Sequence, residues 1–382
     1  MTEYHAPLLQ SLSIRSTRLR SRIVMSPMTR GFSPDGVPGS DVADYYRRRA
    51  ENGVGLIVTE AVGIDHPAAV GSAGFDEHDV PHMFGAKALD GWKRVVADVH
   101  AAGGAIFPQL WHQGVMREPD TGPCPAAPSC RPSGDWGPTG RPTSLRPDYI
   151  SRMAPATQAM TESDIQEVID AFGRSAAHAR ECGFDGIAIL GAHGYLIDSF
   201  LWAETNRRSD RWGGGLKERT RFAVEVVKSI RRAAGEDMPI LFRFSQWKQQ
   251  DFSARLVNTP QELEQMLGPI ADAGIDVFDA STRFFAKSAF EGSDMTLAGW
   301  AKKVTGRMSM AVGGIGMQAD GRDPAANAKP DNLDRVLEHI RREEFDLVGL
   351  GRPLIADPGW LGKLLSGSPA NPYTQSLLDK LC

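Results

Sequence analysis

The chain has 382 residues, so its length allows two or three ordinary domains or one large barrel. Its 41% hydrophobic and 24% charged residues match the composition of an average globular protein. A net charge of −4 without clustered basic residues argues against nucleic acid as a partner. No apolar stretch reaches the ~18 residues of a membrane span, and the N-terminus lacks a secretory pattern. We therefore expect a cytoplasmic protein.

Eight short apolar runs recur along the chain, and helix-like segments lie between them. A run of about four to six residues that is apolar throughout is typical of a strand buried on both faces. The runs are residues 23–26, 55–59, 105–110, 186–190, 239–244, 275–280, 310–313 and 346–350.

The intervening segments show the spacing of apolar residues that is typical of helices. Examples are residues 42–52, 89–104 and 161–183. In the last, Thr161 and Asp164 form a start of capping-box type, and Gly183 marks the end. The alternation predicts a single (β/α)8 barrel over residues 1–382. A doubly wound sheet is the alternative, but the eight regular units and the lack of an opening G-x-G-x-x-G motif disfavour it.

Residues 115–160 interrupt this alternation after the third strand. The segment is rich in proline, glycine and serine, and we expect it to hold no helix. It is too long for an ordinary connection, which favours an excursion over the carboxyl-terminal mouth of the barrel. A disordered surface loop is the alternative.

The four cysteines suggest neither a disulfide framework nor a metal centre. No two of them have C-x-x-C spacing, so neither a zinc site nor an iron–sulfur cluster is indicated. We expect free thiols at Cys124, Cys130, Cys182 and Cys382.

In a (β/α)8 barrel the chemistry lies where the strands end, and several of these strands end in polar residues. The first four such groups are Ser26-Pro27-Met28-Thr29, Thr59-Glu60-Ala61, Gln109-Leu110-Trp111-His112, and Leu190 with His193 and Tyr195. Arg243 ends the fifth run, and burying an arginine is costly without a partner. That partner is either a carboxylate of the barrel or an electron-rich edge of a cofactor.

Two glycine-rich turns follow the seventh and eighth runs, at 313–316 and 349–352. Glycines such as Gly313, Gly314 and Gly351 let backbone N–H groups approach an anion, and Arg352 adds a cation. Barrels commonly bind phosphate at this place, although the glycines have the alternative role of making tight turns.

These strand ends together favour a flat phosphorylated heterocycle. Gln109 can donate to and accept from an imide-like ring edge, Arg243 lies at the rim, and Thr29 supplies a small polar group. FMN meets these needs, and another phosphorylated ligand is the alternative.

Motifs from nearly the whole chain also point to a known family. They include M-S-P-M-T-R at 25–30, Y-Y-R-R-R-A at 45–50, T-E-A at 59–61, Q-L-W-H at 109–112, A-H-G-Y-L-I at 192–197, A-V-G-G-I at 311–315 and G-L-G-R-P-L at 349–354. In this order and spacing, they resemble the old yellow enzyme family of FMN-dependent ene-reductases.

The resemblance implies a role for each matching position. Ser26, Pro27, Met28, Thr29, Ala61 and Gln109 would contact the flavin ring. Arg243 would lie at its N1 and O2 edge, and Gly313, Gly314, Gly351 and Arg352 would hold the phosphate. Trp111 would shape the substrate pocket.

The same resemblance implies the reaction. NADPH or NADH reduces FMN, and a small α,β-unsaturated carbonyl or nitro compound then receives hydride at its β-carbon. His193 would bind the substrate oxygen, where donors stabilise developing charge, and Tyr195 would protonate the α-carbon. The family leaves the oligomeric state open, and a homo-oligomer is one expectation.

Leu190 departs from the family pattern, which usually has two oxygen-binding donors three residues apart. Either another side chain such as His112 or Arg283 supplies the missing donor, or the substrate needs only one. A third reading is different chemistry, such as the amine dehydrogenation or demethylation of related proteins. Tyr373 is a weak candidate for an aromatic residue that the tail adds to the site.

Two further alternatives belong to other functional classes. One is a flavin-binding barrel that has lost catalysis, which the presence of His193, Tyr195, Gln109 and Arg243 disfavours. The other is a barrel enzyme for a phosphorylated substrate without flavin, which would be colourless.

Overall fold

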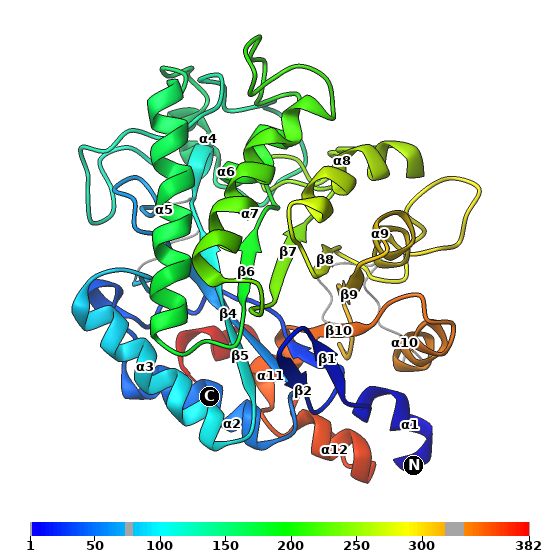
Figure 1. Cartoon of the computed structure of the whole chain (residues 1–382). Coiled ribbons are helices and arrows are strands. Elements are labelled where there is room, and N and C mark those ends of the chain that lie inside the picture. Colours follow the sequence, from blue (N-terminus) through cyan, green and yellow to red (C-terminus); the bar gives the residue numbers. More distant parts are fainter. Residues whose placement is uncertain (1, 73–78, 318–331, 382) are drawn as a thin grey trace.

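The computed structural model describes residues 2–72, 79–317 and 332–381. Eight parallel strands close into a barrel, in which β10 pairs with both β9 and β3 (Figure 1). The predicted (β/α)8 barrel and its eight strands are therefore confirmed. The strands are β3 (Ile23–Met25), β4 (Leu56–Gly63), β5 (Ala105–Trp111), β6 (Ile187–Leu190), β7 (Ile240–Phe244), β8 (Val277–Ser281), β9 (Met308–Val312) and β10 (Leu347–Leu350).

Helices surround the barrel, and the longest, α5 (Glu162–Glu181), begins as predicted. The Thr161 side chain accepts from the Asp164 backbone N–H, and the Asp164 carboxylate accepts from Thr161, which completes a capping box. The other helices are α1 (Thr2–Leu9), α2 (Ser40–Glu51), α3 (Ala86–Ala101), α4 (Pro147–Met153), α6 (Leu196–Leu201), α7 (Arg221–Ala234), α8 (Pro260–Asp272), α9 (Leu297–Thr305), α10 (Asn332–Arg341), α11 (Arg352–Ala356) and α12 (Trp360–Ser366).

The barrel interior is filled by apolar side chains from alternate positions of the strands. An antiparallel hairpin of β1 (Leu12–Ile14) and β2 (Thr17–Leu19) closes the end where the strands begin. Ile14 and Leu19 pack there against the interior residues of the barrel. The sequence analysis did not predict this hairpin. The interior cluster also contains Val24, Leu56, Val58, Ala105, Phe107, Ala188, Leu241, Val277, Met310 and Leu347.

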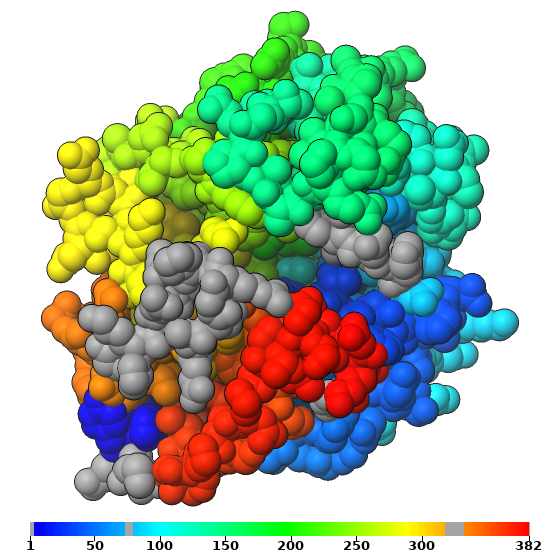
Figure 2. All heavy atoms as spheres, turned by 180° about the vertical axis from the view of Figure 1, so that it is seen from behind, coloured from blue at the N-terminus to red at the C-terminus, as the bar shows by residue number. Residues whose placement is uncertain are grey.

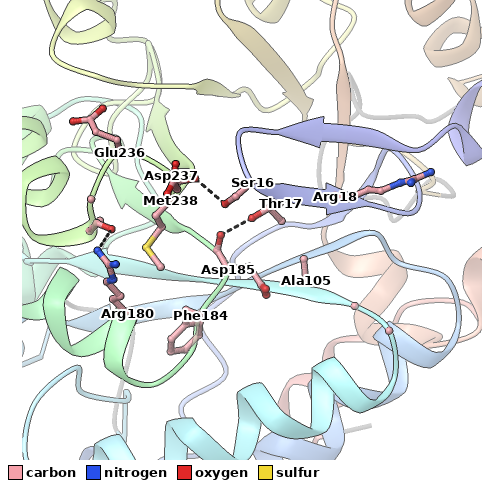
Figure 3. Close-up of a pocket in the computed structure, with 14 residues that line it drawn as sticks. Ser16, Thr17, Arg18, Ala105, Arg180, Phe184, Asp185, Glu236, Asp237 and Met238 are labelled. Carbon is pink, nitrogen blue, oxygen red and sulfur yellow. Dashed lines mark hydrogen bonds between the residues drawn. The ribbon is translucent and has the colours of Figure 1, made fainter.

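A pocket of about 430 Å³ lies beside the hairpin (Figure 3). Its hydrogen bonds hold the hairpin in place: the Thr17 hydroxyl donates to the Asp185 carbonyl, and the Ser16 hydroxyl donates to the Asp237 carbonyl. Asp185 and Asp237 precede β6 and β7, so this pocket is at the end of the barrel opposite the predicted chemistry. In this fold that end serves stability.

The segment 115–160 packs on loops that follow β6 and β7. The Ser133 hydroxyl accepts from the Arg207 backbone N–H, and the Pro142 carbonyl accepts from the Phe252 N–H at 2.7 Å. The expectation that this segment holds no helix is wrong, because α4 lies within it. The helix begins at Pro147, and the fixed φ of proline suits a first helical position.

Two smaller expectations concern the cysteines and membrane spans. Cys124, Cys130 and Cys182 are free cysteines, and Cys382 lies outside the described residues. Among the described residues, no helix has both the length and the apolar character needed to cross a membrane.

Candidate active site

Three of the predicted site residues share the inner face of the barrel. Side chains alternate along a strand, so continuing the interior rows of β5, β6 and β7 by two residues reaches Gln109, Leu190 and Arg243. Leu190 is the register partner of Arg243, and Arg243 is in turn that of Asp279. The strand ends therefore form one layer of side chains above the apolar interior.

Several polar atoms of this layer are buried without a partner among the described residues. They are the Ser26 hydroxyl, Gln109 Nε2, Trp111 Nε1 and Arg243 Nη2. Native proteins rarely leave buried polar atoms unpaired, because each costs about 1–3 kcal/mol. Their convergence at one barrel end indicates a place for a polar ligand.

For Arg243 the structure shows one of the two partners that the sequence left open, a carboxylate of the barrel. Its Nε donates to the Asp279 carboxylate at 2.5 Å, so it does pair with a carboxylate of the barrel. Its Nη2 has no partner among the described residues and stays available to a ligand. Burial raises the pKa of Asp279, and the neighbouring guanidinium opposes this shift.

A carboxylate outside the barrel layer joins β4 to the loop that carries Thr29. Glu60 is 2% exposed, and its Oε2 accepts the backbone N–H groups of Arg30 and Gly31, each at 2.9 Å. Burial raises the pKa of Glu60 to about 7, although both hydrogen bonds act in the opposite direction. This connection holds the Thr29 loop beside the strand end at Ala61.

The glycine-rich turns after β9 and β10 leave little room for a side chain at Gly313 and Gly351. A Cβ on Gly313 would lie 2.4 Å from the Thr282 carbonyl oxygen. On Gly351 it would lie 3.2 Å from the sulfur of Met28. Gly314 has a φ of +68°, which favours glycine, and a Cβ there would meet nothing closer than 3.5 Å. Exposed backbone at such turns suits close approach by a phosphate.

The carboxyl-terminal tail lies against these loops. In Figure 2 the red tail residues lie beside blue residues from the start of the chain. Arg30 donates to the carbonyls of Leu377 and Lys380, which fixes the tail next to the Thr29 loop. The Tyr373 ring centroid is 5.8 Å from the guanidinium carbon of Arg352. Tyr373 thus lies against Arg352, the side chain that is predicted to bind the phosphate.

His193 is held by groups from two other strand ends. Its Nε2 is 2.8 Å from the Ser281 hydroxyl, and its ring stacks on Trp247 with a centroid distance of 4.2 Å. Its backbone N–H donates to the Ser245 hydroxyl. Burial, and then the nearby charge of Arg243, hold the pKa of His193 well below its usual range. The imidazole is therefore neutral at physiological pH.

Tyr195 is buried at the amino-terminal end of α6, with 5% of its surface exposed. Its ring meets that of Trp111 edge to face, with a centroid distance of 5.1 Å and an interplanar angle of 89°. The structure thus brings together Tyr195 and Trp111, the predicted proton donor and pocket residue.

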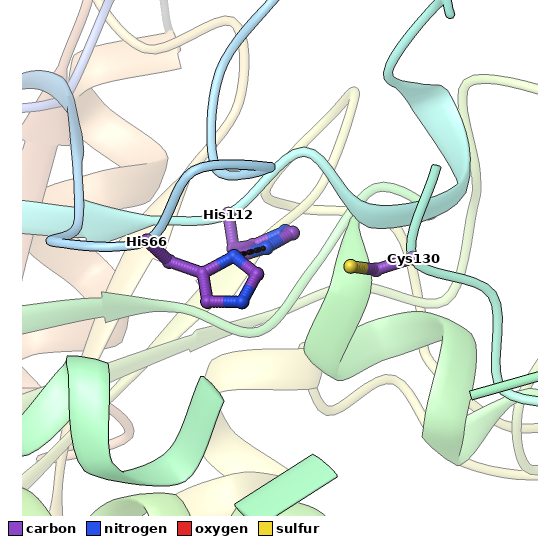
Figure 4. A group of neighbouring side chains, drawn as sticks. All are labelled: His66, His112 and Cys130. Carbon is purple, nitrogen blue, oxygen red and sulfur yellow. Dashed lines mark hydrogen bonds between the residues drawn. The ribbon is translucent and has the colours of Figure 1, made fainter. Parts of the chain in front are cut away.

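Of the two candidates for the missing donor, His112 lies elsewhere, whereas Arg283 lines a pocket together with Trp247 and Ser281, which hold the His193 ring. His112 follows Trp111 and therefore points to the opposite face of β5, where its Nε2 is 3.1 Å from His66 Nδ1 (Figure 4). Arg283 is exposed, with its guanidinium carbon 4.4 Å from the centroid of the Phe252 ring. Both nitrogens of His112 are occupied, since Nδ1 accepts the Gly114 N–H.

His66, His112 and Cys130 form a cluster whose ligand atoms lie within 4.8 Å of one another (Figure 4). The sequence indicated no metal centre, and the hydrogen bonds also argue against one. His112 Nδ1 accepts the Gly114 N–H, so its proton is on the Nε2 that faces the cluster. His66 Nδ1 likewise accepts the Ala68 N–H. Burial raises the pKa of Cys130 to about 12, so its thiol is protonated in this arrangement.

Four residues of this site had no signal in the sequence analysis. Ser281 and Trp247 fix the ring of His193, while Asp198 and Lys248 form a buried ion pair beneath its turn. Ser281 ends a strand, so a search of every strand end would have found it. The other three depend on how loops meet in space.

The sequence of this chain also matches a model of a known protein family. The model described as the NADH:flavin oxidoreductase / NADH oxidase family matches residues 7–371. The chain belongs to this family. The match confirms the resemblance to the old yellow enzymes, and the family implies FMN as its cofactor.

Relatives in the family include an NADH oxidase from Thermoanaerobacter brockii, 33% identical over 91% of this chain and 49% of its own length. The 12-oxophytodienoate reductase 7 of Oryza sativa subsp. japonica is 39% identical over 61% of this chain and 57% of its own length. The chain thus spans about half the length of these relatives.

Solved structures share the fold. Morphinone reductase in complex with tetrahydroNAD matches with a TM-score of 0.77 and 24% identity, covering 97% of this chain and 93% of that one. The old yellow enzyme homologue from Zymomonas mobilis also has a TM-score of 0.77 and 24% identity, covering 97% and 96%.

The residues of this chain fit FMN. The unpaired Nη2 of Arg243 and Nε2 of Gln109 suit the oxygen-rich edge of an isoalloxazine ring. The backbone exposed at Gly314 and the guanidinium of Arg352 suit a phosphate. Residues 318–331, which follow Met317 in the sequence, lie outside the described residues.

Proposed function

We propose that this chain is an NAD(P)H-dependent FMN oxidoreductase that reduces activated alkenes, such as α,β-unsaturated carbonyl or nitro compounds. The observation that carries the proposal is the placement of Tyr195 and His193 at the barrel end where Gln109 and Arg243 present unpaired polar atoms. The names of two relatives, an NADH oxidase and a 12-oxophytodienoate reductase, support the same class of reaction.

When bound at this layer, FMN would supply two-electron redox chemistry between the nicotinamide and the alkene. Arg243 would stabilise negative charge at the ring edge, and Gln109 would orient the ring. Ser26, Pro27, Met28, Thr29 and Ala61 would line it, while Gly313, Gly314, Gly351 and Arg352 would hold the phosphate.

Tyr195 would donate the proton that completes the reduction. A tyrosine hydroxyl is protonated at neutral pH because its pKa in model peptides is about 10. Trp111 packs edge to face against this ring and so limits its movement. His193 is neutral because it is buried, and the ring nitrogen that does not face the Ser281 hydroxyl would bind the substrate oxygen through its N–H.

Because position 190 is a leucine, the substrate site lacks one of the two hydrogen-bond donors of the family pattern. The position of Leu190 next to Arg243 in the layer is apolar, so charge on the substrate oxygen would be stabilised from the His193 side alone. This single feature also favours the second candidate, oxidation of an amine, in which no carbonyl oxygen needs two donors.

We further propose that residues 115–160 border the substrate site. The segment hydrogen-bonds to the loop after β7 through Pro142 and Thr143. The same loop carries Trp247, which stacks on His193. A substrate bound at His193 would therefore lie close to this segment.

The first test is anaerobic spectroscopy of the purified chain. We expect a yellow protein that NADPH or NADH bleaches and that cyclic enones, nitroalkenes or maleimides then reoxidise. A colourless chain that FMN cannot reconstitute would refute the flavin proposal. Bleaching without reoxidation by any activated alkene, but with reduction by methylated amines, would favour amine oxidation.

The second test separates the proton donor from the rest of the site. Tyr195→Phe keeps the ring that packs on Trp111 but lacks the hydroxyl. We expect normal FMN content and normal reduction by NADPH, with reoxidation by a cyclic enone slowed about 100-fold or more. Tyr4→Phe is the matched control, because Tyr4 is an exposed residue whose hydroxyl donates to Asp334 and which has no part in the site. Equal slowing of both half-reactions in Tyr195→Phe would contradict the assigned role.

A further inference from the structure

Asp198 and Lys248 form an ion pair that is completely enclosed. Both side chains are 0% exposed, and the lysine Nζ lies 2.8 Å and 2.9 Å from the two carboxylate oxygens. Asp198 is in the first turn of α6, whereas Lys248 is in the loop after β7. The pair therefore joins two neighbouring strand ends at the candidate active site.

Each partner also holds the turn that carries His193. Asp198 Oδ2 accepts the Gly194 backbone N–H at 2.7 Å. Lys248 Nζ donates to the Ser245 carbonyl, and the Ser245 hydroxyl in turn accepts the His193 N–H at 3.0 Å. Across the same contact, the Gln249 N–H donates to the His193 carbonyl. The backbone on both sides of His193 is thus tied to the ion pair.

The turn needs such support because its backbone is in an unfavourable region. His193 has a φ of +65°, which non-glycine residues rarely adopt, and Gly194 has a φ of +86°. This φ strains any other residue at position 194, and a Cβ there would also lie 2.0 Å from Gln250 Oε1, which would have to move. Strained backbone persists at functional sites only where the surroundings impose it.

Stability alone is a poor reason for this pair. Replacing a buried ion pair with apolar residues of similar volume is often neutral or stabilising, since two charges must lose their water. What distinguishes this ion pair is its geometric specificity. The two charged groups make several hydrogen bonds, and these can all form in only one arrangement of the two loops.

We propose that the Asp198–Lys248 pair is a positioning device that sets the His193–Tyr195 turn for substrate binding and proton donation. The inference rests on the proposed function, because it assigns the pair to the half-reaction in which the alkene is reduced. The pair touches neither substrate nor cofactor in this role. It acts through Gly194, Ser245 and the start of α6.

The test uses the FMN-loaded double variant Asp198→Leu/Lys248→Met, which replaces the pair with apolar groups and leaves no uncompensated charge. Stopped-flow measurement separates FMN reduction by NADPH from reoxidation by a cyclic enone. We expect reduction within about twofold of wild type and reoxidation slowed about 100-fold, the loss typical of a misplaced reacting group. Reoxidation at the wild-type rate, or equal slowing of both steps, would overturn the proposal.

Arg231→Met is the matched control for general loosening. Arg231 pairs with Asp276 at the opposite end of the barrel, where both side chains are also largely buried (8% and 10% exposed). We expect a lower melting temperature but an unchanged ratio of the two rates. A changed ratio in this control would show that any buried pair has this effect and would overturn the proposal.

A second measurement does not need the flavin. Amide hydrogen exchange of residues 191–200 in the FMN-free chain reports the order of the turn directly. We expect faster exchange there in the double variant and unchanged exchange in α5. Unchanged exchange at 191–200 would overturn the positioning role, whereas a wild-type chain that binds no FMN would refute only the proposed function.

Discussion

The buried carboxylate of Glu60 predicts a specific dependence of stability on pH. Glu60→Gln keeps the size of the side chain and an oxygen that can accept the N–H groups of Arg30 and Gly31. It removes the group that titrates. The variant therefore differs from wild type only in that position 60 can no longer bind or release a proton.

The magnitude follows from the pKa of this carboxyl, which burial raises from 4.5 to about 7. Between these values folded Glu60 holds a proton that the unfolded chain has lost, so the free energy of unfolding decreases as the pH rises. At 1.36 kcal/mol per pH unit, the difference of about 2.5 units corresponds to about 3 kcal/mol. This contribution is complete below pH 4.5 and is lost above pH 7.

Urea unfolding followed by circular dichroism at pH 4.5, 6, 7 and 8 measures this effect. We expect wild type to lose about 3 kcal/mol relative to Glu60→Gln between the lowest and highest pH. Glu236→Gln is the control, because Glu236 has a side chain that is 84% exposed. Parallel pH profiles for wild type and Glu60→Gln would refute the reasoning.

Three further predictions concern the site and the scaffold. Leu190→His should raise turnover of a cyclic enone, because a second oxyanion donor lowers the activation free energy by up to ~2.7–4 kcal/mol. Unchanged turnover in a flavin-loaded variant would mean that another group already supplies this donor. Arg243→Leu should release FMN, measured as free flavin fluorescence on dilution, because Asp279 loses its counter-charge and the ring edge loses a donor; full retention of FMN would contradict this. Thr161→Ala should lower the free energy of unfolding by about 1 kcal/mol in urea without changing FMN content, since it removes only the cap of α5 and no residue assigned to FMN. A loss of FMN in that variant would show that the cap supports the site.

Local patterns in the sequence determined the scaffold. Runs such as 105–110 and 186–190 became β5 and β6 because an apolar run bounded by turns has few other ways to be buried. The capping box at Thr161 formed as predicted because its two partners are three residues apart. The excursion at 115–160 was less well predicted. Its many prolines concealed the short helix that begins at Pro147.

Only the tertiary structure decided which side chains meet. Trp111 and His112 are neighbours in the sequence, yet alternation along β5 sends one toward Tyr195 and the other toward His66. The partners of His193 come from residues more than 50 positions away, at Trp247 and Ser281. Such contacts depend on the register of the closed barrel and on the path of its loops, which short-range periodicity does not encode. The sequence by itself therefore identified the family and most of the residues at the barrel mouth, while the packing of distant loops determined how those residues are held.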